Sequence, residues 1–323
     1  MSFPEISIII PTYNRCHIVG RAIKSVLKQT YGKIEIIIVD DCSSDKTEHI
    51  IKEISKVDTR VRYFRTEKNI GGAATRNRGV SESHGKYIAF LDDDDEALPE
   101  WLEKSMEKIS TLPESWGLLC CRWYQKSEFT HIIYESAQFL KDGYIYKELL
   151  RGHDPPSGTS GSVVKREAYD YVGGFDESLH GLQDYDFFFS LARKWTFHYL
   201  QIPLIVFYIH PGFRISDTNR KREDAFNHFF KKWEKEIIRI GGRQTLELMR
   251  SKRLAGLFFS RIHTEIISKG RFSALKQLIR SFSRNNFRFA YFIKSLMLIF
   301  VGPVNWDRGR RIRGKLYWKA RGQ

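Results

Sequence analysis

The chain has 323 residues, of which 42% are hydrophobic and 14% aromatic, and it carries 53 Lys and Arg against 38 Asp and Glu. This composition supports a full hydrophobic core and excludes an intrinsically disordered protein. Four Cys in a chain of this length exclude a disulfide-rich secreted scaffold and favour a reducing compartment. The first residues lack the pattern of a signal peptide, and no uncharged apolar run is long enough to span a membrane. We therefore expect a cytoplasmic protein, either soluble or bound peripherally at the inner face of the cell membrane.

The positive charge is concentrated at one end of the chain. Residues 1–240 carry 34 Lys and Arg against 35 Asp and Glu, whereas residues 241–323 carry 19 against 3. Such asymmetry predicts a balanced domain, 1–240, followed by a basic extension, 241–323, that meets an anionic partner. Phospholipid, nucleic acid and nucleotide are all candidates for that partner.

The first hundred residues alternate between two kinds of pattern. Apolar runs with no more than one polar residue each, typical of strands buried on both faces, occur at Ile6–Ile10, Ile34–Val39, Val61–Phe64 and Tyr87–Leu91. Helical spacing of apolar residues lies between them, at Ile18–Leu27, Asp45–Val57 and Ala73–Gly85. This alternation predicts βαβ units and an α/β fold with a mostly parallel central sheet flanked by helices.

The rest of the chain has a mixed pattern. A helix is expected from Pro99 onward, and a second helix at Asp184–Lys194. Strands are predicted at Trp116–Tyr124, Gly158–Val164, Phe197–Gln201 and Leu204–His210. A polar helix is predicted at Arg220–Arg239, and Gly241-Gly242 marks a boundary. Three basic amphipathic segments follow, at Leu246–Ser268, Phe272–Ser283 and Phe287–Val301.

Polar and acidic segments follow the four predicted parallel strands. They are Pro11–Arg15, Asp40–Asp45, Asn69–Gly72 and Asp92–Asp95. In an open parallel sheet, ligands bind outside the carboxyl ends of the strands. These four segments are therefore expected to meet at one edge and to form a ligand site.

Four consecutive carboxylates at a strand end repel one another, and a divalent cation would relieve the repulsion. Hard oxygen ligands suit Mg²⁺ or Mn²⁺, which readily bridge a protein carboxylate to a diphosphate. The alternative is a solvated acidic turn with a helix cap.

Other residues of this edge suit a nucleotide. Asp41 can accept hydrogen bonds from a base or ribose, and Tyr13 can stack on a base. Gly71-Gly72 permit close backbone approach to a ligand, or simply form a turn. Arg76 and Asn77 lie where they can reach a phosphate or sugar, although a surface Arg is common.

Taken together, these segments resemble family 2 glycosyltransferases. The resemblance rests on Ile8–Arg15, Val39–Asp45, Asn69–Asn77 and Phe90–Asp95, and covers roughly residues 4–215. It implies the GT-A fold, a nucleotide-sugar donor, and transfer that mostly inverts the anomeric configuration.

The resemblance also implies roles for individual residues. Pro11 and Tyr13 would line a uracil pocket, and Asp41 would hold the base. Asp92 would face the ribose and Asp94 would bind the Mn²⁺ or Mg²⁺ ion that bridges the diphosphate. Asp93 is kept as a further nucleotide-sugar contact because the acidic run leaves the register open by one residue.

Two later motifs extend the resemblance. Gly173–Glu177 resembles the family's Gly-Gly-Phe-Asp-Glu motif, and Asp184 matches its catalytic base, with a helix N-cap as the alternative. Gln183 departs from the family's usual Glu, which puts the positioning of the base in doubt. His210 matches a His that often faces the diphosphate; its alternative is a buried residue at a strand end.

The resemblance therefore implies a hexosyltransferase that uses a UDP-sugar, with glucose or galactose favoured. An undecaprenyl-diphosphate-linked saccharide, as in O-antigen and other bacterial surface polysaccharides, is the expected acceptor. The competing hypotheses are a nucleotidyltransferase, whose Gly-rich, Lys-bearing loop is replaced here by Pro11–Arg15, and a nucleic-acid-binding protein. We expect no nucleic acid partner, because the strand-end acids would repel a phosphate backbone.

The basic extension is expected to bind an anionic membrane surface. Its large apolar residues would then enter the interface, and they include Phe289, Phe292, Ile293, Leu296 and Phe300. The alternative is a set of helices that pack on the catalytic domain while their charges remain solvated.

Overall fold

The computed structural model describes residues 4–127, 133–135, 141–151, 158–209 and 219–282, together with Leu296 and Phe300. The chain divides into two compact units. The first consists of Met1–Leu149 and His153–Ile215, and the second of Leu150–Gly152 and Ser216–Gln323. The contacts within the chain thus place the boundary between the two units after residue 215. The boundary at residue 240, which the charge distribution predicts, stays a prediction.

The first unit opens with the predicted βαβ units. Its strands are β1 (Ile6–Thr12), β2 (Ile34–Asp40), β3 (Val61–Arg65) and β4 (Tyr87–Phe90). They alternate with α1 (Val19–Leu27), α2 (Thr47–Val57) and α3 (Gly72–Ser81). β1 pairs in parallel with both β2 and β4, and β2 pairs in parallel with β3. The prediction of a parallel sheet is therefore confirmed for these four strands.

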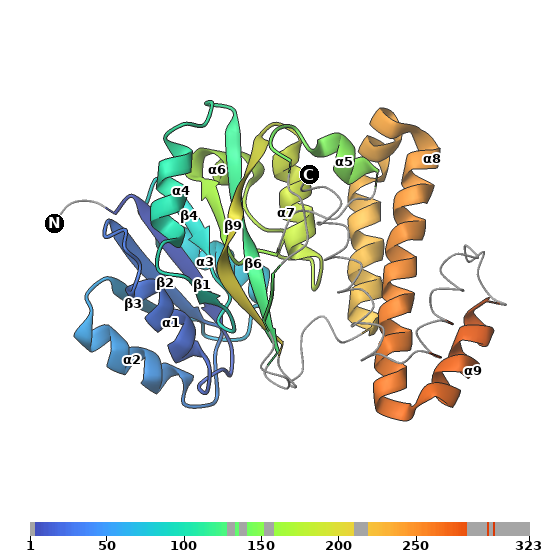
Figure 1. Ribbon diagram of the computed structural model, residues 1–323, viewed down its shortest axis with the longest axis horizontal. Helices are drawn as coiled ribbons and strands as arrows, with labels where there is room; N and C mark the ends of the chain where they lie inside the picture. Colours follow the sequence, from blue (N-terminus) through green and yellow to red (C-terminus); the bar gives the residue numbers. More distant parts are fainter. Residues whose placement is uncertain are drawn as a thin grey trace, which may run out of the picture. The chain divides into compact units, whose positions relative to one another are not determined.

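The remaining strands extend the same sheet with mixed direction. They are β5 (Glu96–Ala97), β6 (Trp116–Ser127), β7 (Ile133–Glu135), β8 (Ser162–Lys165) and β9 (Thr196–Ile209). The sheet order is β3-β2-β1-β4-β8-β6-β9-β5, with β7 paired to β6 (Figure 1). β8 is antiparallel to both β4 and β6, while β6 and β9 are parallel. The helices of this part are α4 (Trp101–Ile109), α5 (Tyr146–Leu150), α6 (Arg166–Val172) and α7 (Gln183–Ala192).

Helices cover both faces of the sheet because the strands are apolar on both faces. Ile8, Ile36 and Ile38 pack in one core cluster with side chains of α1, α2 and α4. On the opposite face, Gly79 of α3 packs directly on Ile9. Phe90 on that face meets aromatic rings of α6 and α7. The first unit is therefore a three-layer α/β/α structure (Figure 1).

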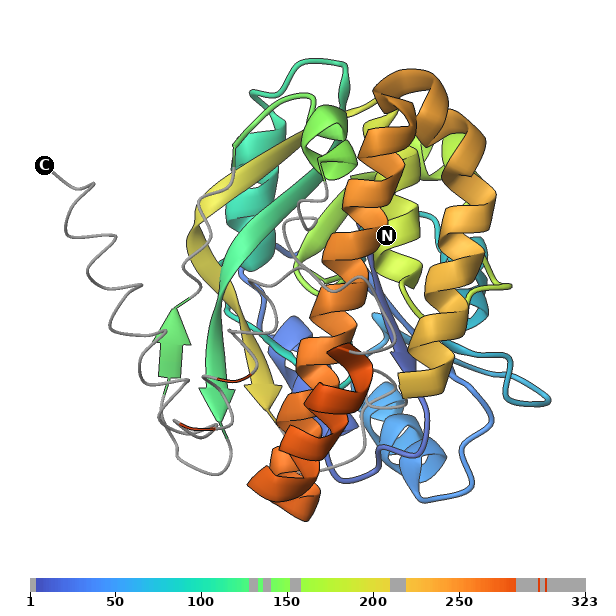
Figure 2. The same cartoon turned by 90° about the vertical axis from the view of Figure 1, so that its right-hand side faces the viewer.

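The second unit is helical in the part that the structure describes. α8 (Asn219–Lys269) is interrupted at Gly242, whose φ of 76° and ψ of 169° are not helical. The predicted helix Arg220–Arg239 therefore forms a first arm, and the two arms run side by side in both Figure 1 and Figure 2. α9 (Arg271–Phe282) follows, with Ala274 and Leu278 buried. Of the predicted segment Phe287–Val301, only Leu296 and Phe300 belong to the described residues, so Phe289, Phe292 and Ile293 lie outside them.

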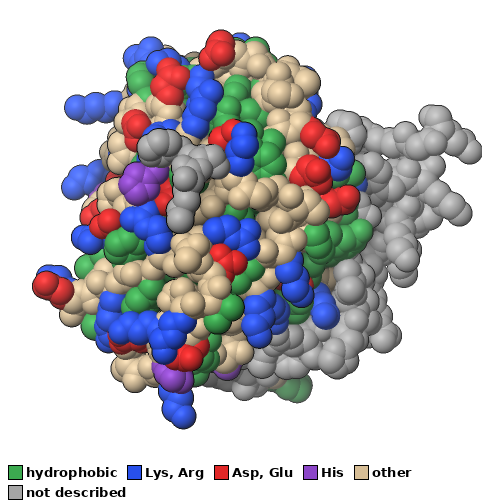
Figure 3. Space-filling view, turned by 90° about the vertical axis from the view of Figure 1, so that its left-hand side faces the viewer, with side chains coloured by type: hydrophobic (Ala, Val, Ile, Leu, Met, Phe, Trp, Pro, Cys, Tyr) green, Lys and Arg blue, Asp and Glu red, His purple; other side chains and the backbone are tan. Residues whose placement is uncertain are grey.

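Two surface properties of the described residues bear on function. No helix among them is both long enough and apolar enough to cross a membrane. On the face of the first unit in Figure 3, basic and acidic side chains are interspersed. Within the same unit, opposite charges form ion pairs such as Lys52–Glu48 and Arg78–Glu82. This agrees with the near-neutral balance of residues 1–240.

Candidate active site

The predicted strand-end segments meet at one edge of the sheet. Thr12 at the end of β1 lies opposite Asp40 at the end of β2, and Ile9 of β1 lies opposite Phe90 at the end of β4. Pro11 and Tyr13, Asp41 and the run Asp92–Asp95 therefore come from three adjacent strands at the same edge. Tyr13 is 47% exposed, so its ring is accessible to a ligand.

Asp41 is only 4% exposed, and both of its carboxylate oxygens accept backbone hydrogen bonds. Oδ1 accepts from the N–H of Ile70 over 2.7 Å, and Oδ2 accepts from the N–H of Gly71 over 2.9 Å. Gly71 has a φ of 87°, which a side chain would disfavour. Asp41 therefore holds the loop that leads into Gly72 and α3, a role that sequence analysis missed. Its assignment to the nucleobase stays a prediction.

Arg76, in the first half of α3, joins three distant parts of the chain. Its Nη2 donates to Oδ1 of Asp92 over 2.6 Å, and its Nη1 lies 3.4 Å from Oε1 of Gln183. Nη1 also donates to the carbonyl of Gly72. The Arg76 side chain is 13% exposed, so its charge acts where solvent screening is weak.

The four consecutive acids alternate in burial. Asp93 and Asp95 are buried, whereas Asp92 and Asp94 are partly exposed. Burial, together with the neighbouring Asp94 and Asp92, raises the pKa of Asp93 to about 7, although the Thr12 hydroxyl and the charge of Arg15 lower it. The pKa of Asp95 is raised for the same reasons. The accessible carboxylates are thus two residues apart, the spacing of the predicted Asp-x-Asp motif.

This donor set suits a hard divalent cation. Among the described residues, no group of three His, Cys, Asp or Glu is placed to hold a metal by itself. The partly exposed carboxylates of Asp92 and Asp94 can supply protein oxygens, and a diphosphate can supply the rest. A cation would also offset the crowding of negative charge that raises the pKa of Asp93. The residues therefore fit Mn²⁺ or Mg²⁺.

Asp184 lies in the first turn of α7. The N-cap residue of this helix is Leu182 and not Asp184. Oδ1 of Asp184 nevertheless accepts a hydrogen bond from the backbone N–H of Tyr185 over 2.8 Å. Burial raises the pKa of Asp184, while Arg76 lowers it and Asp92 raises it. Asp184 is therefore within electrostatic reach of both members of the Arg76–Asp92 pair. A carboxyl with a raised pKa at a ligand edge suits proton transfer.

The structure does not support a ligand contact for Asn77, and it does not describe His210. The hydrogen-bonding positions of the Asn77 amide are filled by other parts of the protein rather than facing the strand-end acids. His210 lies outside the described residues.

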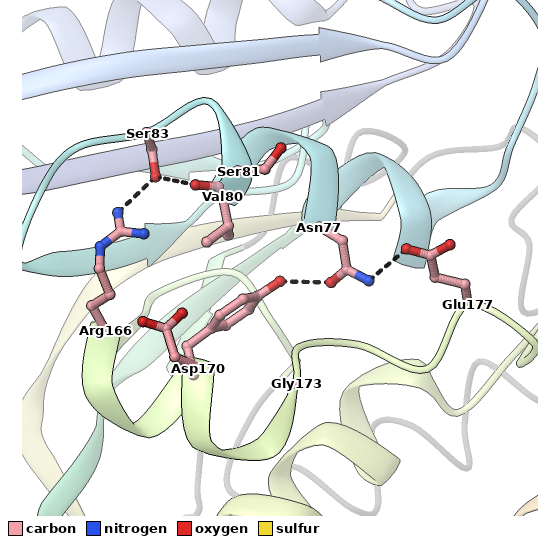
Figure 4. A pocket seen from close by; sticks show the side chains of 9 residues that line it. Asn77, Val80, Ser81, Ser83, Arg166, Asp170, Gly173 and Glu177 are labelled. Carbon is pink, nitrogen blue, oxygen red and sulfur yellow. Dashed lines mark hydrogen bonds between the residues drawn. The ribbon is translucent and has the colours of Figure 1, made fainter.

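A surface cavity of about 410 Å³ lies between α3 and α6 (Figure 4). The residues that line it are Asn77, Val80, Ser81, Ser83, Arg166, Tyr169, Asp170, Gly173 and Glu177. None of the strand-end acids is among them, and Asp184 is not either. The candidate site residues therefore lie at the carboxyl edge of the sheet and do not line this cavity.

The comparison with protein families gives one match within the same region. The family model described as "Glycosyl transferase family 2" matches residues 7–173. This stretch contains β1 to β4, the acidic run and Arg76, and it ends just before Gly174.

Similar curated proteins come from several bacteria. A GalNAc(5)-diNAcBac-PP-undecaprenol beta-1,3-glucosyltransferase of Campylobacter jejuni is 29% identical over 66% of this chain and 64% of its own length. The putative teichuronic acid biosynthesis glycosyltransferase TuaG of Bacillus subtilis is 40% identical over 32% of this chain and 41% of its own. The putative colanic acid biosynthesis glycosyl transferase WcaA of Escherichia coli is 26% identical over 78% of this chain and 90% of its own. The chain thus spans about two fifths to two thirds of the first two relatives.

Two solved structures share the fold at low sequence identity. TarS 1–349 of S. aureus in complex with UDP-GlcNAc has a TM-score of 0.61 and 18% identity, covering 92% of this chain and 81% of TarS 1–349. The mannosyltransferase PcManGT of Pyrobaculum calidifontis, in complex with GDP-Man and Mn²⁺, has a TM-score of 0.57 and 16% identity, covering 93% and 88%. The predicted fold is therefore confirmed.

Proposed function

This chain belongs to glycosyl transferase family 2, and from that premise we propose that it transfers a hexose from a UDP-sugar to a saccharide in the assembly of a cell-surface polysaccharide. One observation carries the proposal. Arg76 forms an ion pair with Asp92 and a hydrogen bond with Gln183, the residue before Asp184 and 107 residues away in the sequence, at the edge where a nucleotide sugar would bind. The site then contains the Arg76 guanidinium, the Asp92 and Asp94 carboxylates and the partly buried carboxyl of Asp184, groups that suit glycosyl transfer.

The base in the proposed mechanism is Asp184. An acceptor hydroxyl would lose its proton to the ionised Asp184 carboxylate while its oxygen attacks the anomeric carbon of the donor. Attack from the side opposite the leaving group inverts the anomeric configuration, and no protein nucleophile takes part. Arg76 would stabilise the negative charge that develops on the leaving diphosphate.

Asp94 would hold the divalent cation, and Asp92 would bind the ribose. When bound, Mn²⁺ or Mg²⁺ supplies a positive charge beside the diphosphate. Pro11, Tyr13 and Asp41 would surround the uracil ring. Gly72 would approach the diphosphate through its backbone, and His210 stays assigned to the diphosphate by family resemblance alone.

The choice of UDP is supported by the bound UDP-GlcNAc of the structurally similar TarS. Glucose or galactose remains the favoured hexose. An acceptor linked through diphosphate to undecaprenol is supported by the printed name of the Campylobacter relative. Such an enzyme would act in the biosynthesis of a polymer such as O-antigen, colanic acid or teichuronic acid.

A lipid-linked acceptor places the enzyme at a membrane surface, and the basic second unit supports this location. Residues 241–323 carry 19 Lys and Arg against 3 Asp and Glu. Phe272, at the start of α9, is 92% exposed, and the neighbouring Arg271 and the nearby Lys276 are exposed too. A protruding aromatic side chain among basic ones suits an anionic bilayer interface better than a nucleic acid.

The proposal is tested by a donor screen with mass-spectrometric readout. Purified protein with MnCl₂ receives UDP-glucose, UDP-galactose, UDP-GlcNAc or GDP-mannose, and either prenyl-diphosphate-linked GlcNAc or the free sugar as acceptor. We expect a product one hexose heavier with a UDP-hexose, formed faster on the lipid-linked acceptor and far more slowly with Asp184→Asn. Absence of transfer from every donor to both acceptors would contradict the proposal.

A further inference from the structure

Asn77 follows Arg76 on α3. All the hydrogen-bonding positions of its side chain are filled by Tyr169 of α6 and by Phe175 and Glu177 of the loop between α6 and α7. Oδ1 accepts from the backbone N–H of Phe175 over 2.9 Å and from the hydroxyl of Tyr169 over 2.6 Å. Nδ2 donates to the backbone carbonyl of Phe175 and to Oε1 of Glu177, both over 2.8 Å. Figure 4 shows the amide pointing from α3 across to Glu177. A side-chain amide has two donors and two acceptor positions, so Asn77 is fully satisfied and fixed in orientation.

The same side chain therefore holds both backbone polar groups of Phe175. The residue before it, Gly174, has a φ of 80°, and a Cβ there would come within 2.7 Å of both Asn77 Oδ1 and the Tyr169 hydroxyl. Only a glycine allows the chain to pass this close to Asn77 in that conformation. The glycine of the motif and the asparagine of α3 are thus two parts of one contact.

Phe175 is 2% exposed, and its ring contacts side chains of α3, β4 and α7. It stacks on Phe187 of α7 with 4.3 Å between centroids, and it meets Phe90 of β4 edge-on at 5.3 Å. The guanidinium carbon of Arg76 lies over the ring, 5.7 Å from its centroid. α7 begins with Gln183 and Asp184, and β4 leads into Asp92. The ring is therefore in contact with Arg76 and with the two elements that present Asp92 and Asp184.

We propose that Asn77 is a positioning residue for glycosyl transfer: by holding Phe175, it keeps Arg76 and Asp184 at the distance from each other that the reaction needs. Asn77 touches neither donor nor acceptor in this account. The inference rests on the proposed function, since it assigns Arg76 and Asp184 their roles there. Beyond that function, it assigns Asn77 an effect on the reaction that is transmitted by Phe175 and not by contact with a ligand.

Asn77→Asp tests the proposal because it keeps the size of the side chain and removes the Nδ2 donor. The variant leaves the carbonyl of Phe175 without its partner and sets a carboxylate against that of Glu177. We expect kcat to fall about 10-fold to 100-fold, because small displacements of the reacting groups cause losses of this size. The KM for the UDP-sugar should change by less than about 3-fold, because Arg76 keeps its ion pair with Asp92.

A second substitution separates the two partners of Nδ2. In Asn77→Asp combined with Glu177→Gln, the new amide can donate to the new carboxylate, but the carbonyl of Phe175 still lacks a donor. The proposal predicts that the double variant stays as slow as Asn77→Asp, while Glu177→Gln alone keeps wild-type turnover. Recovery of turnover in the double variant would overturn the proposal, since Glu177 would then be the contact that matters.

Phe175→Leu supplies an independent variant in case Asn77→Asp folds poorly. It keeps an apolar side chain and removes the ring that Arg76 and Phe187 contact. If Asn77 acts through Phe175, the combination of Asn77→Asp and Phe175→Leu is no slower than the slower single variant. Multiplied losses would overturn the proposal. Arg78→Ala on the same helix, whose side chain pairs only with Glu82 among the contacts described, is the matched control and should keep wild-type kcat.

Hydrogen–deuterium exchange tests the physical coupling without any turnover. In Asn77→Asp, amides of residues 174–188 should exchange faster than in wild type, while those of α1 and α2 should not change. Unchanged exchange at 174–188 would overturn the inference. If wild type transfers no sugar but this exchange pattern is found, the proposed function fails and the Asn77–Phe175 coupling stands.

Discussion

Arg76 and Asp92 form an ion pair of 2.6 Å that joins α3 to the residues following β4. Both charges act on Asp184, and they act in opposite directions: Arg76 lowers the pKa of that carboxyl and Asp92 raises it. Burial has the largest effect and raises the pKa. The three residues therefore form one electrostatic unit, and changing one charge is expected to move the titration of Asp184.

The first prediction concerns the pH dependence of kcat. A general base must be ionised, so turnover rises with pH through the pKa of Asp184, above the value of about 3.9 for an ordinary Asp. Arg76→Met removes the charge that lowers this pKa and should move the rising limb to higher pH. Asp92→Asn removes a charge that raises it and should move the limb to lower pH. Both variants lose turnover, so the midpoint of the limb is what is compared, and shifts in the same direction would contradict the account.

The second prediction concerns the metal. Asp94→Ala should abolish transfer that depends on Mn²⁺ or Mg²⁺ and weaken UDP binding in the presence of MnCl₂, since a partly exposed oxygen ligand is lost. Circular dichroism should show an intact fold. Glu53→Ala, on the exposed surface of α2, is the matched control for loss of a carboxylate. Undiminished transfer by wild type in excess chelator would rule out a required metal.

The third prediction uses two adjacent glycines as a matched pair. Gly173 and Gly174 have φ values of 78° and 80°, but a Cβ on Gly173 meets nothing within 4 Å, whereas one on Gly174 meets Asn77 and Tyr169. Gly173→Ala should cost about 1 kcal/mol of unfolding free energy for its backbone conformation alone. Gly174→Ala should cost a further ~1–3 kcal/mol because the site is overpacked. Urea midpoints measure both, and equal losses would show that the close approach is not restrictive.

Much of the first unit could be predicted because its signals are local. Ile6–Ile10 and Ile34–Val39 are apolar except for Ser7 and Glu35, a pattern typical of strands buried on both faces, and β1 and β2 extend these ranges by two residues and one residue. The expected strands Phe197–Gln201 and Leu204–His210 form a single strand, β9. Pro203 lies within this strand opposite Arg122, where the pairing of β6 with β9 shifts its register.

The contacts within the site were harder to predict because they join distant segments. The parallel sheet predicts that Asp41 and Asp92 lie at the same edge. The backbone hydrogen bonds to Asp41, however, depend on the path of a loop about 30 residues later in the sequence. The contact between Arg76 and Gln183 spans 107 residues. Gln183 did stand out in the sequence as a departure from Glu, and the structure adds that its carbonyl oxygen faces Arg76. Phe175 gave no signal beyond membership of a motif.

The fourth prediction concerns the membrane. Full-length protein should co-sediment with vesicles containing anionic lipid, less with neutral ones, and less as salt rises. Phe272→Ser should reduce sedimentation with anionic vesicles because an exposed apolar side chain is lost from α9, and Lys276→Glu should do so because a charge is reversed. Val57→Ser, at an 87% exposed position on α2 of the first unit, is the control. Equal sedimentation with neutral and anionic vesicles would remove the electrostatic attraction from the account.

The central claim is that Asp184 is the base of a UDP-hexose transfer, and the paired measurement of turnover and UDP affinity for Asp184→Asn tests it most directly. This substitution keeps the shape of the side chain and removes its ability to take a proton. The account predicts that kcat falls by about 10²–10⁴ while the Kd for UDP with MnCl₂ is nearly unchanged. Wild-type turnover in Asp184→Asn would contradict it and would move the base to another residue.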